Sequence, residues 1–295
     1  MSDFRLKVFQ SVAKNLSFTK ASQELFVSQP AITKHIQELE ATYQTRLFDR
    51  QGSKISLTES GRLLLEHCER ILEDYKRLEY EMYLLHNEYI GELKLGASTT
   101  IAQYVLPPLL GSFIGKFPQV NLSLLNGNSR EIEAALQEHR IDLGLVEGVF
   151  RLPNLKYTTF LEDELVAVVH SKSRLQLPEE ITPQDLPAIP LVLRERGSGT
   201  LDVIERSLQK HGVKLASLHV LMYLGSTESI KLFLENSDCM GIVSIRSICK
   251  ELAAGTFRVV EIKDMPMLRD FCFVQLQGQE GGLSQAFMNY MFMSR

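Results

Sequence analysis

The sequence predicts an α/β region preceded by a small helical domain and one long helix. Three observations predict it: helical apolar spacing over residues 4–40, a proline-free apolar stripe over residues 58–89, and apolar runs that alternate with helical segments from Gly91 onwards. With 295 residues, 44% of them hydrophobic, the chain is long enough for about two domains.

Two short helices are predicted at the start of the chain. Apolar residues recur at helical spacing over residues 4–16, and the segment Asn-Leu-Ser then ends the pattern. Ser17 or Thr19 can cap a second helix, on which Ala21 is small enough to let another helix approach closely.

A third helix is predicted over residues 28–40, with Ser28 as its N-cap. Pro30 is tolerated there because first-turn amides have no intrahelical partner. Its buried stripe is predicted to be Ile32, Ile36 and Leu39. The opposite face is uncharged or cationic, which suits the major groove of DNA, where Gln can bond adenine and Thr can touch a thymine methyl.

Two short strands around Gly52 are predicted next, as a wing that lies along the phosphate backbone. The candidate DNA-contacting residues of the helix and the wing are Ser28, Gln29, Pro30, Thr33, Lys34, Gln37, Arg50 and Lys54. A three-helix packing unit with a merely solvated polar face is the alternative. Charge does not decide between them, because the net charge is −4 and residues 1–60 carry eight Lys/Arg against six Asp/Glu.

The long helix carries an apolar stripe at alternating steps of four and three, which is a heptad pattern: Leu64, Cys68, Ile71, Tyr75, Leu78, Met82 and Leu85. A helix of this length is too long for a small winged domain to cover its apolar stripe, so we expect a second chain to cover it. Packing on the rest of its own chain is the alternative. The candidate dimerisation residues are Leu64, Ile71, Tyr75, Leu78, Met82 and Leu85.

The remaining two-thirds of the chain shows the α/β alternation. Helices are predicted near residues 100–116, 129–139, 199–211, 227–236 and 246–253. Ser, Thr, Asn and Gly gather at four strand-to-helix junctions, where hydroxyls, amides and the helix dipole can bind a small anion without any Lys or Arg. The alternative for each junction is a simple N-cap.

The stretch FTKASQELFVSQPAITKHIQELEATYQTRLFDR, followed by ISLTESG, resembles the winged helix-turn-helix of LysR-type transcriptional regulators, and the resemblance runs the length of the chain. It implies a winged helix-turn-helix at 1–58, a linker and dimerisation helix at 59–90 and an effector-binding domain at 91–295. That domain would comprise two Rossmann-like lobes of periplasmic-binding-protein type. Lobe I would cover about 91–162 and 269–295 and lobe II 163–268, with crossover strands near 160–166 and 266–273.

The segments LGASTTIAQYVLP, DLGLVEG, LRERGSGT and GSTESIKLFLENSDCMGIVS resemble the branch that regulates sulfur assimilation and carbon dioxide fixation. That branch implies a sulfur oxyanion or a phosphorylated metabolite as effector. The implied effector-binding residues are Ser98, Thr99, Thr100, Asn128, Glu147, Gly197, Ser198, Gly199, Thr200 and Thr227. Glu147 is unexpected beside an anion, and the sequence leaves open whether it is paired or turned away.

The resemblance also implies a regulator that binds double-stranded DNA as a dimer or tetramer, at an inverted-repeat operator. RNA polymerase is a further candidate partner. We expect a cytoplasmic protein with no membrane partner, because no apolar run reaches the length of a signal peptide or a membrane span.

Two other classes of protein fit the sequence less well. A serine hydrolase is disfavoured because Ser198 lacks the Gly-x-Ser-x-Gly spacing, and we expect no catalytic residue. A small-molecule-binding protein without a DNA function fits residues 91–295 but not the first ninety. The four cysteines have no metal-ligand or CxxC spacing, so we expect no metal and no cofactor besides the anionic effector.

Overall fold

The computed structural model describes residues 4–51, 54–86, 89–148, 151–278 and 282–294. The chain divides into two compact units, residues 1–87 and residues 88–295.

Three helices around one apolar core begin the first unit: α1 (Phe4–Asn15), α2 (Phe18–Glu24) and α3 (Gln29–Tyr43). Of the two predicted caps of α2, Ser17 is used, and its hydroxyl accepts the Lys20 amide at 3.2 Å. Ser28 caps α3 as predicted by accepting the Ala31 amide at 3.4 Å. The predicted inward stripe of α3 is buried, so its polar side faces outward.

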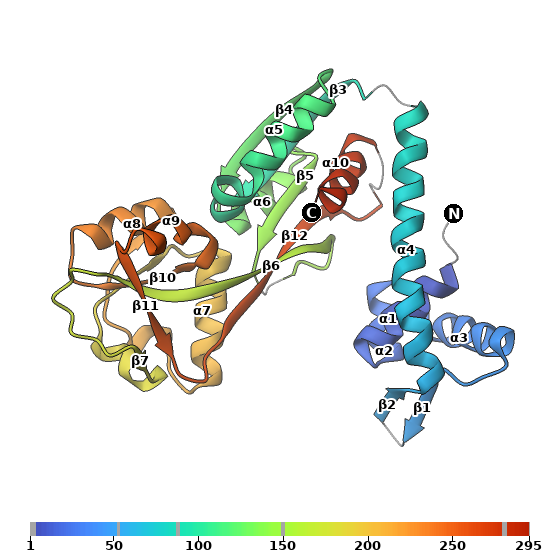
Figure 1. The fold of residues 1–295 in the computed structure, drawn as a ribbon, viewed down its shortest axis with the longest axis horizontal. Coiled ribbons are helices and arrows are strands. Elements are labelled where there is room, and N and C mark those ends of the chain that lie inside the picture. Colours follow the sequence, from blue (N-terminus) through green and yellow to red (C-terminus); the bar gives the residue numbers. More distant parts are fainter. Residues whose placement is uncertain (1–3, 52–53, 87–88, 149–150, 279–281, 295) are drawn as a thin grey trace. The chain divides into compact units, whose positions relative to one another are not determined.

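The predicted wing is an antiparallel hairpin of β1 (Phe48–Gln51) and β2 (Lys54–Leu57). Phe48 anchors it, since its ring lies 5.5 Å from that of Phe9 in the helical core. The first unit therefore has the winged helix-turn-helix arrangement (Figure 1).

The long helix is α4 (Glu59–His86), 28 residues in length. One part of its apolar stripe is buried within the first unit, and another part is exposed. Cys68 and Leu72 are buried in the core of the first unit, and Leu64 packs partly against it, whereas Ile71 and Leu78 are exposed. The part of the predicted stripe around Leu64 and Cys68 thus packs on α1–α3 of its own chain. Leu63, outside the predicted stripe, is also exposed.

The second unit is built on one large mixed sheet with the strand order β4-β3-β5-β12-β6-β10-β8-β9. One end forms lobe I, with parallel strands and helices on its faces. Its elements are β3 (Gly91–Ser98), the π-helical turn η1 (Ile101–Val105), α5 (Leu106–Lys116), β4 (Val120–Gly127), α6 (Ser129–Gln137), β5 (Leu143–Glu147) and α10 (Gly282–Met293).

The other end of the sheet forms lobe II. Its strands are β7 (Glu180–Ile181), β8 (Leu191–Arg194), β9 (Val220–Leu224), β10 (Met240–Ser244) and β11 (Phe257–Ile262). Its helices are α7 (Gly199–Lys210), α8 (Thr227–Glu235) and α9 (Cys249–Ala253), with 3-10 turns η2 (Pro183–Ala188), η3 (Leu215–Ser217) and η4 (Ile245–Ser247).

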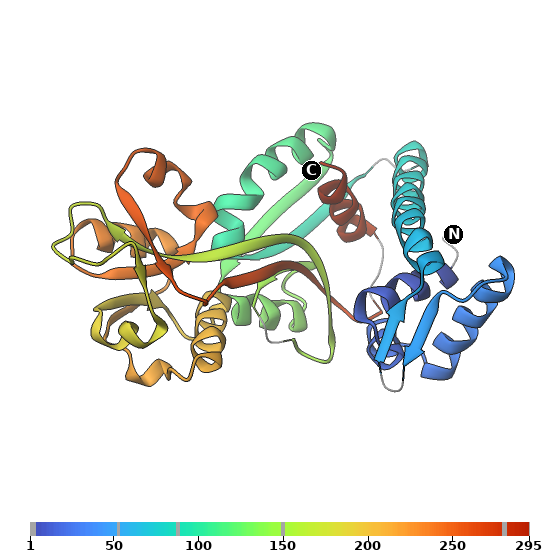
Figure 2. The ribbon, with the colours of Figure 1, turned by 60° about the horizontal axis from the view of Figure 1, so that its bottom comes forward.

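Two long antiparallel strands, β6 (Leu155–His170) and β12 (Met267–Leu276), run through both lobes and connect them (Figures 1 and 2). The predicted crossover strands were therefore too short. No Gly or Pro interrupts either segment, so each crossover continues into the neighbouring lobe strand. The predicted lobe boundaries fall inside these strands. β7 and β11 were not predicted, although the alternation in residues 257–262 is a strand signal.

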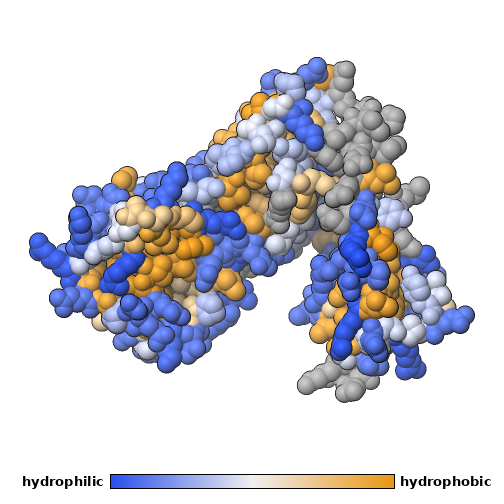
Figure 3. All heavy atoms as spheres, in the orientation of Figure 1, coloured by the Kyte–Doolittle hydropathy of each residue, from blue (hydrophilic) through white to orange (hydrophobic). Residues whose placement is uncertain are grey.

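Each edge of the sheet carries an exposed apolar strand. Leu124 and Leu125 are exposed on β4 at one edge, and Leu221, Met222 and Tyr223 on β9 at the other. Figure 3 shows apolar surface between polar residues on both lobes. None of the helices in the described part of the chain has the length and apolar character needed to cross a bilayer.

Candidate functional site

The outer face of α3 presents the side chains that the sequence predicted as DNA contacts. Ser28, Gln29, Pro30, Lys34 and Gln37 are exposed. The N-terminal end of α3 is therefore open to a partner, as helix insertion into a major groove requires.

Two further contacts order this face. Thr33 is half-buried and its hydroxyl donates to the Gln29 carbonyl at 3.1 Å, while Gln29 Oε1 accepts the Thr19 hydroxyl at 3.4 Å. Arg50 and Lys54 lie in β1 and β2, and their side chains lie outside the described part of the structure.

Between the lobes, the start of α7 lies against the end of β5, which pairs with β3. Ser98, Thr99 and Thr100 are all buried, and so is every residue from Gly197 to Thr200. A methyl group on Gly199 would lie 1.9 Å from the Glu147 carbonyl oxygen, so only glycine permits this approach of the two lobes.

At the other two predicted junctions, which precede α6 and α8, the polar side chains have different roles. Asn128 is the N-cap of α6 and accepts the Glu131 amide at 3.0 Å, in a capping box, so the N-cap alternative holds for its side chain. Arg130 also donates its amide to the Gly197 carbonyl at 3.3 Å, which keeps this junction beside α7. Thr227 is buried at the start of α8, where Ser226 is the cap.

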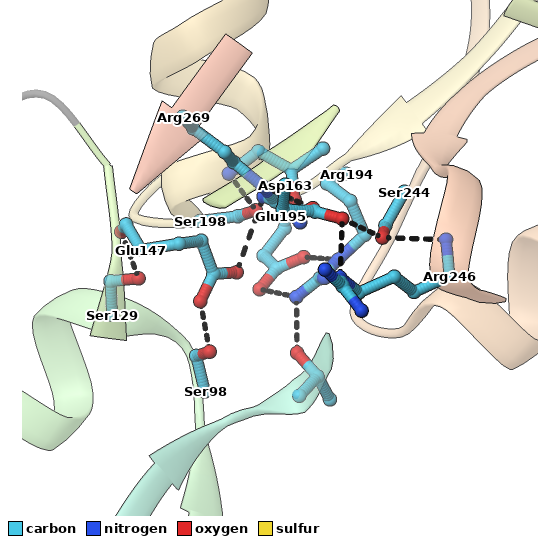
Figure 4. Close-up of polar contacts among 12 residues, drawn as sticks. Ser98, Ser129, Glu147, Asp163, Arg194, Glu195, Ser198, Ser244, Arg246 and Arg269 are labelled. Carbon is cyan, nitrogen blue, oxygen red and sulfur yellow. Dashed lines mark hydrogen bonds and ion pairs between the residues drawn. The ribbon is translucent and has the colours of Figure 1, made fainter. Parts of the chain in front are cut away.

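Glu147 is paired, which answers the question that the sequence left open. The Ser98 hydroxyl donates to its carboxylate, and Arg269 Nη1 lies 3.5 Å from its Oε1 (Figure 4). Ser129 donates its hydroxyl to the Glu147 carbonyl at 2.8 Å. The carboxylate therefore already accepts the hydrogen bond that the Ser98 hydroxyl can donate, and it is held in place by its partners.

Arg269 is the centre of a buried network. It donates to Asp163 at 2.8 Å and to the Thr200 hydroxyl at 2.8 Å, and Asp163 also accepts the Ser244 hydroxyl at 2.7 Å. Arg269 lies on β12, Asp163 on β6 and Thr200 on α7, so the network ties the connecting strands to lobe II. Figure 4 shows Arg269 and Ser244 on either side of Asp163.

Arg194 is the functional candidate that the sequence reasoning missed. Arg194 is the last residue of β8, and only 1% of its side chain is exposed. Its Nη2 donates to Thr99 Oγ1 at 2.7 Å and its Nε to Glu195 at 2.8 Å, whereas its Nη1 has no hydrogen-bond partner among the described residues. The buried Thr100 hydroxyl likewise has none within the described chain.

The sequence predicted an anion site built without Lys or Arg, whereas the structure places Arg194 beside the predicted residue Thr99. The buried guanidinium and the buried Thr100 hydroxyl both lie between the lobes, and each has a polar atom without a hydrogen-bond partner among the described residues. Burying such a group costs free energy unless a partner binds it. The available signal was an arginine in LRERGSGT that directly ends an apolar strand.

A second set of polar contacts links the lobes. The Tyr104 hydroxyl on η1 donates to the Glu228 carboxylate on α8, and Lys231 donates to the same carboxylate at 2.9 Å. Lys231 Nζ also lies 2.5 Å from Glu251 and 5.5 Å from the Tyr104 ring centroid. Burial, with the hydrogen bond to Glu228, raises the pKa of Tyr104, so the phenol stays protonated as the donor.

A cavity of about 360 Å³ lies between α6 and the start of α7, lined in part by Arg130, Glu133, Glu147 and Asp202. Burial raises the pKa of Glu133, which the hydrogen bond from Tyr157 only partly offsets. Burial also raises the pKa of Asp202. The lining of this cavity therefore includes two carboxyls, Glu133 and Asp202, whose charged forms are disfavoured by burial.

Ser198 Oγ accepts the Thr200 amide at 3.2 Å as the N-cap of α7, which accounts for Ser198 without a nucleophile. Within the described residues, no group of three or more His, Cys, Asp or Glu side chains is placed to hold a metal ion.

Comparison with known proteins agrees with this arrangement. Residues 4–62 match the family described as bacterial regulatory helix-turn-helix protein, lysR family, and residues 86–292 match the LysR substrate binding domain. The fold and site define a DNA-binding transcriptional regulator with an effector-binding domain, and the chain belongs to the LysR family. The matched families are regulators, which confirms the expectation against an enzyme.

Among curated relatives, the HTH-type transcriptional regulator CysL of Bacillus subtilis is 30% identical over 269 residues, covering 91% of this chain and 89% of that protein. The RuBisCO operon transcriptional regulator of Acidithiobacillus ferrooxidans is 30% identical over 289 residues, covering 98% and 92%. These relatives confirm the predicted resemblance to the branch of sulfur-assimilation and carbon-dioxide-fixation regulators.

Among solved structures, the CcmR regulatory domain of Synechocystis PCC6803 in complex with 2-PG is 28% identical. It covers 69% of this chain and 97% of that chain, with a TM-score of 0.62. The match to CrgA of Neisseria meningitidis, a LysR-type transcriptional regulator, covers 100% of this chain and 99% of that chain, with a TM-score of 0.70. Its 19% identity supports the fold alone.

Proposed function

We propose that this regulator is controlled by a small oxyanion bound between the lobes by Arg194, Thr100 and the start of α7. The observation that carries the proposal is the pair of buried polar groups, Arg194 Nη1 and Thr100 Oγ1, which have no partner among the described residues. An oxyanion offers acceptors to both at once, and the N-terminal end of α7 adds a favourable dipole.

The effector class is a sulfur oxyanion or a phosphorylated metabolite. Both present several acceptor oxygens on one centre, which suits a guanidinium and hydroxyl pair. The CcmR regulatory domain was solved with 2-PG, which supports this class for a similar lobe pair.

The operator reading is assigned to α3, with Gln29, Thr33, Lys34 and Gln37 directed at base edges and Arg50 and Lys54 at phosphates. Because its partner is chromosomal DNA, we place the protein in the cytoplasm. Contact with RNA polymerase stays a prediction.

Assembly as a dimer or tetramer rests on apolar surfaces that the described chain leaves uncovered. On α4 these are Leu63, Ile71 and Leu78, which are 59%, 40% and 52% exposed and recur at helical spacing. The exposed edge strands β4 and β9 provide a second surface for pairs of effector domains. A two-fold dimer reads an inverted repeat.

Regulation follows from closure of the lobes about β6 and β12. A bound anion would favour the closed form, change how effector domains pack between subunits, and so alter the spacing of the two DNA-reading helices.

Thermal melting of the full-length protein tests the ligand assignment. Sulfite, sulfate, thiosulfate and 2-phosphoglycolate are titrated separately, and we expect at least one to raise Tm in a concentration-dependent way. Arg194→Gln should abolish that rise, and Arg174→Gln, a change at a side chain 93% exposed to solvent, should preserve it. No rise with any of the four anions would contradict the proposed effector class.

A further inference from the structure

Phe26 occupies a backbone position that normally suits glycine. It follows α2 and has φ 53°, in the left-handed region where a Cβ is strained. The Val27 amide donates to the Ser22 carbonyl at 3.1 Å, which is the six-to-one bond of a Schellman motif. In that motif the left-handed residue is usually Gly and sometimes Asn.

Most of the Phe26 side chain lies outside the core of the first unit. Its neighbours Leu25 and Val27 pack against the core of the first unit, whereas Phe26 is 63% exposed. A large aromatic side chain in a strained conformation and in solvent is costly twice over, because glycine or asparagine would relieve the strain and expose no ring.

The location of Phe26 indicates what covers it. It stands two residues before Ser28, the N-cap of α3, and the exposed residues Gln29 and Pro30 follow directly. In a helix-turn-helix, this N-terminal end of the second helix contacts base edges. Phe26 therefore borders the surface assigned to the major groove.

The charge around the turn favours the same partner. Lys20 and Lys34 are exposed on α2 and α3. The one acidic residue of residues 17–37, Glu24, is engaged by the Ser11 hydroxyl at 2.7 Å and the Asn15 amide at 2.6 Å, both on α1. A cationic surface with one exposed aromatic ring suits DNA better than an apolar protein groove.

We propose that Phe26 is a DNA-contacting residue, whose ring packs on a thymine methyl and the adjoining deoxyribose at the rim of the major groove. Apolar contact between Phe and the thymine methyl is an established form of base readout. The contact would add sequence preference just outside the bases reached by Gln29 and Thr33. The inference rests on the proposed DNA-reading function of α3.

The test separates folding from DNA binding with two variants, Phe26→Gly and Phe26→Asn, in the full-length protein. Both relieve the left-handed strain, so both should melt at a higher temperature than the unmodified protein. Both should nevertheless bind about tenfold more weakly to a duplex selected from a random pool, measured by fluorescence anisotropy at fixed salt. The dependence of affinity on salt should not change, because Phe26 neutralises no phosphate.

Gln44→Gly is the matched control. Gln44 is also exposed and left-handed, with φ 49°, but it caps the opposite end of α3. This variant should gain stability and keep its DNA affinity. Equal weakening by Phe26→Gly and Gln44→Gly would assign the effect to a loosened backbone and overturn the proposal.

Two further outcomes also decide the matter. Phe26 variants that are more stable and bind DNA as the unmodified protein does would overturn the contact, as would a loss of dimer in sedimentation, which would make the ring a surface between copies. Gln29→Ala, measured in parallel, distinguishes failure of the Phe26 contact from failure of the DNA-reading function of α3. If it changes the preferred sequence while the Phe26 variants do nothing, the DNA-reading function survives and only the Phe26 contact fails.

Discussion

Arg194 donates a hydrogen bond at 2.7 Å to the hydroxyl of Thr99, a residue that lies 95 positions earlier and in the other lobe. The bond holds the guanidinium at the lobe boundary and leaves its Nη1 open. An anion bound there would touch lobe II through Arg194 and lobe I through Thr100, and so would stabilise the lobes in contact.

Arg194→Gln should weaken binding of the effective anion by roughly 10- to 150-fold, because a hydrogen bond to a charged group contributes about 1.5–3 kcal/mol. Titration calorimetry with the anion identified by melting measures this directly. An unchanged Kd would remove Arg194 from the site.

Gly199→Ala should hold the lobes apart, because its methyl group meets the backbone of Glu147 rather than a movable side chain end. We expect weaker anion binding and a larger radius of gyration of the isolated effector region in small-angle scattering. Gly111→Ala is the matched control, since no atom lies within 4 Å of the added methyl group and Gly111 is inside α5. It should bind the anion normally and gain slightly in stability.

Tyr104→Phe should lower the apparent anion affinity several-fold without removing any ligand contact. The lost hydroxyl no longer bridges to Glu228, so the binding-competent closed form is less populated and the apparent Kd rises in proportion. The control is Tyr223→Phe on the exposed strand β9. Equal affinity of the Tyr104 variant and the unmodified protein would show that this bridge does not govern closure.

Glu133→Gln should stabilise the protein at neutral and higher pH. The pKa of Glu133 is raised in the folded state, mainly by burial, so folded protein binds more protons than unfolded protein above the ordinary Glu pKa of 4.5. Stability attributable to this group is present at low pH and is lost as pH rises through the folded pKa.

The amide cannot ionise and still accepts from Tyr157, so the gain in Tm should reach about 2 °C at pH 8 and vanish near pH 4. Melting scans across this range check it. Glu138→Gln, at an exposed position next to α6, should show no such dependence on pH. A gain that grows as pH falls would reverse the sign and contradict the account.

Gln29→Ala and Thr33→Ala should change which duplex sequence is preferred, since these side chains face base edges in the proposed complex. Lys54→Ala should weaken all sequences alike and reduce the salt dependence by about one counterion. Selection from a random pool, followed by anisotropy at several salt concentrations, distinguishes the two behaviours.

The sequence predicted local features well. Ser28 was predicted as an N-cap because its hydroxyl, the following Pro30 and the apolar stripe all lie within a few residues of one another. The same holds for the wing and for the alternation of strands and helices in residues 91–295. These features depend on interactions between near neighbours in the chain.

The features that were missed depend on distant residues. An arginine at the end of an apolar strand is a weak signal in the sequence, and Arg194 became a candidate site residue only because the structure joins it to Thr99 in the other lobe. Whether Glu147 is paired depends on Ser98 and on Arg269, which lie 49 and 122 positions away. Cys68 fitted a heptad stripe, yet its partner is the Leu6 carbonyl within its own domain.

Control of DNA binding by the anion can be measured by footprinting the full-length protein on its selected inverted-repeat duplex, with and without the anion that raises its Tm. We expect the anion to change the length or spacing of the protected region, and Arg194→Gln to protect the same region in both conditions. A footprint of the unmodified protein that stays the same at saturating anion would contradict this expectation.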